Sequence, residues 1–207
     1  IEWTVRPGSI SERASRLGQF QIVLPFLGGI ALATGLLVEL DPLIKLSLPL
    51  EVIGLVIFLV RMVPTMRGIS WLDSGVARHG VTATIFLIVN IGILVYLIGN
   101  YADDIEAAPV RLLLALDHSI FVGLLTNVIL AMIALTLRTP RAAWVDHAVF
   151  WGTNIGIAGF VVGLLSDQTH LIRTFTPVLG AAILLAIAVH LLDVVKGWAP
   201  SGSTSEA

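Results

Sequence analysis

Long apolar stretches separated by short polar breaks dominate the pattern of this chain. Six of them, 18 to 22 residues long, cover residues 20–38, 43–63, 81–98, 119–137, 148–165 and 171–192. Stretches of about 20 apolar residues match the helix length that crosses a hydrocarbon core. Their apolar residues are continuous rather than alternating, which excludes the strands of a membrane β-barrel. The pattern therefore predicts an all-α, polytopic integral membrane protein with a bundle of six transmembrane helices.

The flanking segments define the predicted domain limits. Residues 1–19 are polar and lack the apolar core of a signal peptide, so we expect a cytoplasmic N-terminal segment there. Residues 20–195 form the predicted six-helix transmembrane domain. Residues 196–207 are rich in Ser and Gly, which predicts a flexible cytoplasmic tail.

Basic residues predict the orientation. Six crossings place both termini on one side, and that side collects nine Lys and Arg residues against three on the other (Lys45, Arg111 and Arg173). Positive charge concentrates on the cytoplasmic side of membrane proteins. We therefore expect a multi-pass protein of the cell membrane with both termini in the cytoplasm.

Composition supports the lipid bilayer as the main surrounding of the chain. Hydrophobic residues make up 57% and charged residues 13%, the net charge is −2, and the mean hydropathy is +0.95. Soluble domains carry about 25% charged residues. These values exclude a soluble globular domain, a disordered chain and a nucleic-acid-binding protein with a basic surface. Cys is absent, so a metal or haem would need His, carboxylate or Met ligands.

Four polar residues lie near the middle of their predicted spans: Glu51, Asn90, Asn127 and Asn154. The Asn side chains fit two interpretations, namely hydrogen bonds between packed helices and a proton or substrate pathway. An acid at the centre of a membrane helix costs about 2.5–3.5 kcal/mol on insertion. We therefore expect Glu51 to face the interior of the bundle.

Histidines supply the candidate cofactor ligands. His79, His147 and His190 lie at the cytoplasmic ends of the third, fifth and sixth spans. A b-type haem needs two facing His residues at one level on separate helices, and His147 and His190 meet the level condition, with His79 as a third candidate. Isolated imidazoles at the membrane interface are the alternative. His118, near the predicted outer end of the fourth span, is a candidate metal ligand.

A short motif occurs twice, as D-H-x-x-F-x-G followed by T-N, in residues 117–127 and 146–154. Together with Asp167 and His170, this motif resembles helices in the catalytic subunit of haem–copper oxidases and nitric oxide reductases, particularly the cbb3-like branch. The resemblance covers residues 117–192. That family has about twelve helices, an adjacent His-His metal pair and a closely spaced His pair, and this chain has none of these. The resemblance implies a reduced relative or a partner subunit without copper-dependent oxygen chemistry.

Three functions remain open at this stage. The first is a membrane subunit of a respiratory or related redox complex that binds b-type haem or contacts quinone. The second is a small transporter or channel with a polar site near the midplane, and the third is a structural subunit of a membrane assembly. All three agree with packing against other membrane subunits or in a homo-oligomer. Hydrolase and P-loop motifs are absent, and the sequence leaves open whether the protein is an enzyme.

Overall fold

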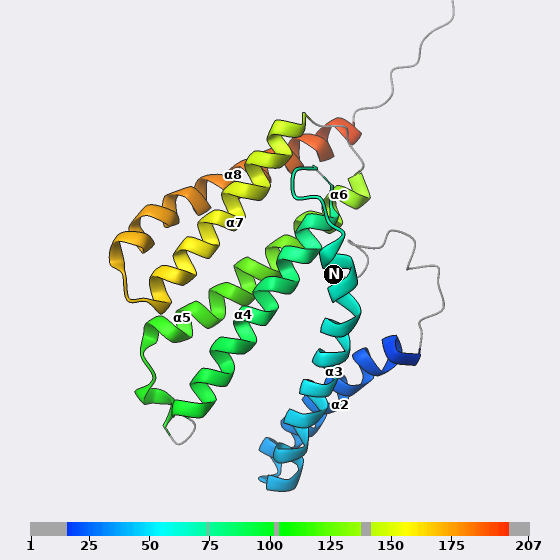
Figure 1. The fold of residues 1–207 in the computed structure, drawn as a ribbon, viewed down its shortest axis with the longest axis vertical. Coiled ribbons are helices and arrows are strands. Elements are labelled where there is room, and N and C mark those ends of the chain that lie inside the picture. The colour runs from blue at the N-terminus through cyan, green and yellow to red at the C-terminus, as the bar shows by residue number, and fades with distance from the viewer. Residues whose placement is uncertain (1–15, 74, 102–103, 138–141, 199–207) are drawn as a thin grey trace, which may run out of the picture. The chain divides into compact units, whose positions relative to one another are not determined.

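The computed structural model describes residues 16–73, 75–101, 104–137 and 142–198. Every regular element within these ranges is helical (Figure 1). The predicted all-α class is therefore confirmed. Most of the predicted N-terminal segment and of the predicted tail lies outside the described residues.

Six of the described spans are long and apolar enough to cross a membrane. They are α2 (Arg16–Leu37), α3 (Asp41–Arg67), α4 (Ala77–Tyr101), the continuous run of α5 (Val110–His118), η2 (Ser119–Leu125) and α6 (Thr126–Leu137), α7 (Ala143–Leu165) and α8 (Thr169–Trp198). A short 3₁₀ turn, η1 (Ile105–Ala107), precedes α5. The chain is thus a multi-pass membrane protein, as its hydropathy predicts.

The fourth span differs most from its prediction. It begins at Val110, nine residues before the expected start at residue 119, because Arg111 and Asp117 interrupt the apolar pattern without interrupting the helix. His118 therefore lies inside this helix, about 12 Å from its first residue at 1.5 Å per residue. The segment η2 that follows is π-helical, with a wider turn than an α-helix.

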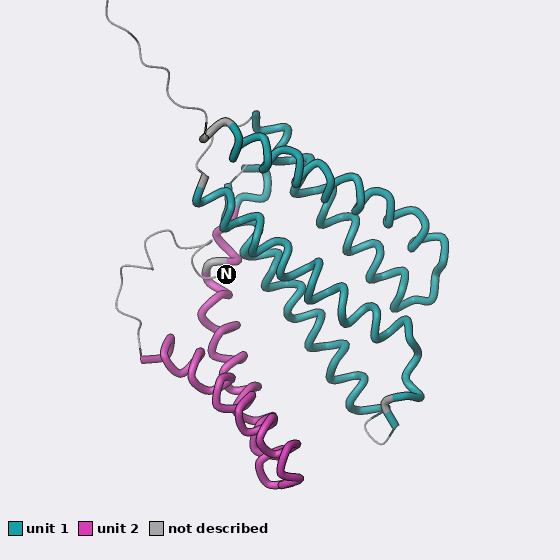
Figure 2. Tube along the Cα trace, turned by 180° about the vertical axis from the view of Figure 1, so that it is seen from behind, with its two compact units in different colours: residues 1, 3–5, 70–207 teal, residues 2, 6–69 magenta. Residues whose placement is uncertain are grey.

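Contacts divide the described residues into two compact units, one within residues 16–69 and one within residues 70–198 (Figure 2). In the larger unit, α7 packs along α8 and against α5, while α4 packs on η2 and α6. The core of this unit contains side chains from four spans, including Phe86, Leu112, Ile157 and Leu179. The smaller unit is the hairpin of α2 and α3.

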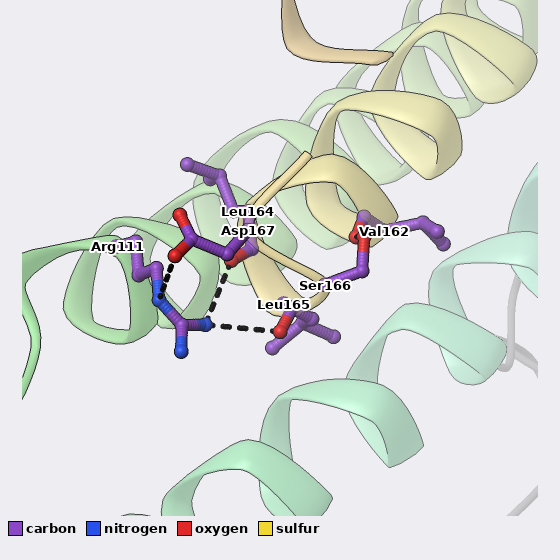
Figure 3. A network of polar contacts seen from close by, with 6 residues as sticks. All are labelled: Arg111, Val162, Leu164, Leu165, Ser166 and Asp167. Atoms are coloured by element: carbon purple, nitrogen blue, oxygen red, sulfur yellow. Dashed lines mark hydrogen bonds and ion pairs between the residues drawn. The ribbon is translucent and has the colours of Figure 1, made fainter. Parts of the chain in front are cut away.

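Arg111 fixes the end of α7 against α5. Its Nη1 donates to the carbonyl oxygens of Leu164 and Leu165 at 3.1 and 2.9 Å, and its Nε lies 3.8 Å from the Asp167 carboxylate (Figure 3). Helix C-termini leave carbonyl oxygens without intrahelical partners and carry partial negative charge. The Arg111 guanidinium donates hydrogen bonds to these carbonyl oxygens, and its positive charge interacts favourably with the partial negative charge of the helix end.

The hairpins α2–α3 and α7–α8 have closely similar turns. Residues 35–49 read GLLVELDPLIKLSLP, and residues 163–177, located 128 positions later, read GLLSDQTHLIRTFTP. In each turn the residue five positions after the glycine donates its backbone N–H to the glycine carbonyl, at 2.8 Å in both cases. The acidic residues Glu39 and Asp167 both adopt positive φ, at 54° and 56°.

Backbone contact at glycine is also the same in the two hairpins. A Cβ built on Gly35 would lie 2.8 Å from Ile44 Cγ1 and 2.9 Å from Ile44 N. A Cβ built on Gly163 would lie 2.9 and 3.0 Å from the same atoms of Ile172. Within each hairpin, the two helices therefore approach each other equally closely at the equivalent glycine. We interpret α2–α3 and α7–α8 as two copies of one hairpin.

Candidate functional site

A pair of asparagines joins the fourth span to α7 inside the larger unit. Asn127 Nδ2 donates to Asn154 Oδ1 at 2.7 Å, and Asn154 Nδ2 donates to Asn127 Oδ1 at 3.1 Å. Each amide nitrogen also donates to a backbone carbonyl of its own helix, at Gly123 and Phe150 respectively. Both side chains are buried. The paired T-N ends of the repeated sequence motif thus meet directly.

His79 of α4 completes this layer. Its Nδ1 lies 2.8 Å from Asn127 Oδ1, and its ring packs edge-on against Phe150 with 4.9 Å between centroids. Because the backbone carbonyls identify the amide nitrogens of the Asn pair, Asn127 Oδ1 is an acceptor and His79 Nδ1 is the donor. In the neutral ring, Nε2 of His79 therefore carries a lone pair.

His147 has the opposite arrangement because of its contact with Arg78. Arg78 Nη1 donates to His147 Nδ1 at 2.8 Å, and Nη2 donates to the Asp146 carbonyl oxygen at 2.8 Å. A guanidinium can only donate, so His147 accepts at Nδ1 and its neutral ring carries the proton on Nε2. Arg78 is 1% exposed, and its guanidinium carbon lies 4.3 Å from the centre of the Phe150 ring.

His190 of α8 is buried and held in one tautomer. Its Nδ1 lies 2.6 Å from the carbonyl oxygen of Ala186, one turn earlier. A carbonyl only accepts, so Nδ1 carries the proton and Nε2 has the lone pair.

A cavity of about 210 Å³ lies among α6, α7 and α8. Its walls are mainly apolar, and its lining includes Ile129, Leu130, Ile133, Ile183, Ala186 and Ile187. Thr126, Thr153 and His190 also border it, almost entirely through their carbon atoms. Thr153 is completely buried, and its hydroxyl makes no hydrogen bond in the described structure. A buried hydroxyl without a partner costs free energy, so a ligand that hydrogen-bonds to Thr153 would recover it.

None of the four predicted midplane residues lines this cavity, and two of them also lie apart from the asparagine pair. Asn90 of α4 donates to the Leu116 carbonyl oxygen at 2.7 Å and to Ser119 Oγ at 2.9 Å, where the π-helical segment begins. Glu51 lies in the separate hairpin of α2 and α3. The four midplane residues of the sequence prediction are therefore distributed over three places.

His118 makes only a local contact, since its Nδ1 lies 2.8 Å from the Leu114 carbonyl oxygen one turn earlier. Its ring packs against Phe160 with 4.9 Å between centroids. Among the residues that the structure describes, no three His, Asp or Glu side chains form a group suited to a metal ion. The prediction of His118 as a metal ligand stays a prediction.

Sequence reasoning named His79, His190 and both asparagines but missed Thr153 and Arg78 as parts of the site. Thr153 directly precedes Asn154 in the repeated motif, and Arg78 directly precedes His79. A buried cation in a membrane helix is a signal that could have identified Arg78. No pattern in the sequence indicates that the Thr153 hydroxyl would be left without a partner.

Models of protein families, curated proteins and solved structures give no match to this chain. The function is therefore inferred from the geometry of the site.

Proposed function

We propose that this chain is a membrane subunit of a redox complex and that the cavity among α6, α7 and α8 binds the head group of a quinol, the reduced form of a lipid-soluble electron carrier. One observation carries the proposal. The apolar cavity is bordered by Thr153, whose buried hydroxyl has no partner among the described residues, and by His190, whose Nε2 carries a lone pair.

The hydrogen-bonding groups of the cavity match a phenolic hydroxyl. Such a hydroxyl donates one hydrogen bond and accepts another, so it can donate to His190 Nε2 while it accepts from Thr153 Oγ1. A quinone carbonyl only accepts and would use Thr153 alone. The site is therefore expected to prefer the reduced form of the carrier.

Oxidation of a quinol to a quinone releases two electrons and two protons. In this site His190 Nε2 would accept the proton of the hydroxyl bound to it, and the proton of the second hydroxyl would pass to water. Both electrons would pass to a redox cofactor, such as a haem or an iron–sulfur cluster, in a neighbouring subunit of the complex. The apolar walls of the cavity suit the ring of such a carrier.

A b-type haem fits these residues less well. The cavity of about 210 Å³ is smaller than the roughly 300–1,000 Å³ of pockets that enclose drug-sized ligands, and a haem is larger still than most of those ligands. The expected ligand His147 also accepts a hydrogen bond from Arg78 at Nδ1. Its Nε2 would then have to lose a proton before it could bind iron.

A transporter with a midplane site receives less support. Asn127 and Asn154 satisfy each other, and Asn90 bonds to Leu116 and Ser119. Amides that are already paired have little capacity left for a passing solute. Their geometry favours the interpretation as hydrogen bonds between packed helices.

Equilibrium binding of decylubiquinol to the purified protein in nanodiscs tests the proposal. Thr153→Val keeps the shape of the side chain and removes the hydroxyl, so the affinity should fall about fivefold to tenfold. The matched control is Thr136→Val, because Thr136 lies on α6 outside the lining of the cavity and its hydroxyl already donates to the Met132 carbonyl. Equal affinities of wild type and Thr153→Val would contradict the site, and so would a wild type that binds no quinol.

The absorption spectrum of the same preparation tests the haem alternative. A Soret band that is present in the wild type and lost in His190→Ala would show that His190 holds haem. That outcome would replace the quinol proposal.

A further inference from the structure

Glu51 occupies an unusual position in the α2–α3 hairpin. It lies half-buried at the contact between the two helices, where a Cβ built on Gly28 would come within 2.7 Å of Glu51 Cγ. Gly28 thus makes room for the Glu51 side chain. No hydrogen bond or ion pair joins the Glu51 carboxyl group to any residue that the structure describes.

The α7–α8 hairpin is an internal control for the role of this acid. The residues that correspond to Gly28 and Glu51, 128 positions later, are Gly156 and Leu179. A Cβ built on Gly156 would lie 2.8 Å from Leu179 N, so the helices approach closely here too. Because leucine supports the same close approach, closure of the hairpin does not require the carboxyl group of Glu51.

An acid in an apolar span is costly unless it is neutral or hydrogen-bonded. A protonated carboxyl group is both a donor and an acceptor. The same side chain from a second copy is therefore a complete partner, since two carboxyl groups can exchange two hydrogen bonds. A two-fold axis brings identical surfaces together in this way.

We infer that the α2–α3 hairpins of two copies of this chain associate in the bilayer through reciprocal hydrogen bonds between their Glu51 carboxyl groups. The surface next to Glu51 is apolar and suits such packing, because Leu48 is 54% exposed and Val52 is 45% exposed. The inference does not rest on the quinol site, which lies in the other unit.

The absence of Cys makes disulfide cross-linking a direct test. Leu48→Cys, one turn from Glu51, should cross-link two copies after mild oxidation of the purified protein in phosphatidylcholine vesicles. Leu184→Cys is the matched control, since it is also exposed on a membrane helix but lies in the other unit. It should cross-link at the rate of random collisions.

Two further substitutions separate the carboxyl group from the surface around it. Glu51→Leu reproduces the residue of the second hairpin, so the protein should fold, while the Leu48→Cys cross-link should fall about tenfold. Glu51→Gln keeps a donor and an acceptor and should retain most of the cross-link. Equal cross-linking with and without Glu51→Leu would overturn the inference, and so would a loss with Glu51→Gln as large as that with Glu51→Leu.

Energy transfer between labelled copies gives a second measurement that needs no cysteine within the membrane. The efficiency of energy transfer should depend on the ratio of protein to lipid, and it should be lower in Glu51→Leu than in the wild type. A wild type that stays monomeric at all ratios would also overturn the inference, and contact with lipid or with a different subunit would then be the remaining role for this surface.

Discussion

Asn127 and Asn154 exchange two hydrogen bonds, at 2.7 and 3.1 Å, across the contact between the fourth span and α7. The Asn127 oxygen accepts from His79 as well, so three spans meet at one amide. Water is scarce at this depth, and an amide that loses its partner finds no replacement easily. The pair therefore fixes both the rotation and the depth of the two helices.

Asn154→Leu should destabilise the protein by about 1–2 kcal/mol, because it leaves the Asn127 amide without its partner. Asn127→Leu should cost at least as much, since it also removes the acceptor for His79. The double variant should cost less than the sum of the two single variants. Unfolding by titration with SDS measures these changes, and strict additivity would contradict a direct interaction. Ile155→Ala, at an exposed neighbouring position, is the control.

Arg111→Ala should lower stability by roughly 1 kcal/mol, since it removes the donor to the end of α7. The loss should arise mainly from the two carbonyl contacts and not from Asp167, whose side chain is 78% exposed. Asp167→Asn should therefore have a much smaller effect than Arg111→Ala. Thermal unfolding in detergent compares them, and similar losses for both variants would assign the main role to the ion pair.

Gly163→Val should destabilise the α7–α8 hairpin by more than about 2 kcal/mol, because any Cβ at Gly163 meets the backbone of Ile172. Gly35→Val should have a similar effect on α2–α3. Gly99→Val is the control, as nothing lies within 4 Å of a Cβ built there. The free energy of unfolding in SDS is the measurement. Equal tolerance at Gly163 and Gly99 would show that the helices can separate without cost.

Both termini should lie in the cytoplasm, because of the nine-to-three distribution of basic residues across the predicted sides. A green fluorescent protein fused to the C-terminus should be bright, and an alkaline phosphatase fusion at the same point should be inactive. An active phosphatase fusion would reverse the predicted orientation.

Hydropathy was sufficient to predict the six spans and the all-α class, because a bilayer imposes one length and one polarity on every crossing. Helix ends were less predictable, since a helix continues past the apolar core into the polar interface. The start of the fourth span was missed for this reason, as Arg111 and Asp117 interrupt hydropathy but not hydrogen bonding.

The residues of the site could largely be predicted from their type and position in the sequence. The residues with which each of them forms hydrogen bonds could be predicted less well. Seven residues separate His147 from Asn154, so helical periodicity places them on one face, and both bond to other spans of the same unit. Periodicity could not show that Arg78 donates a hydrogen bond to His147 Nδ1, because this contact depends on how segments far apart in the sequence pack together. Ideal periodicity also fails across η2, where a π-helical turn changes the rotation of every residue that follows, including Asn127.

The similarity of the two hairpins makes incorrect helix pairing possible during membrane insertion. A helix that closes on a partner through glycine could in principle choose the wrong partner, because the contact surfaces at Gly35 and Gly163 are alike. The three-residue turns at 38–40 and 166–168 favour pairing of α2 with α3 and of α7 with α8. Closing a short loop costs less entropy than closing one of more than a hundred residues, and α3 emerges from the ribosome long before α8. Lengthening either turn should therefore slow correct assembly and increase the exchange of helices between hairpins, even though every contact of the folded protein stays the same.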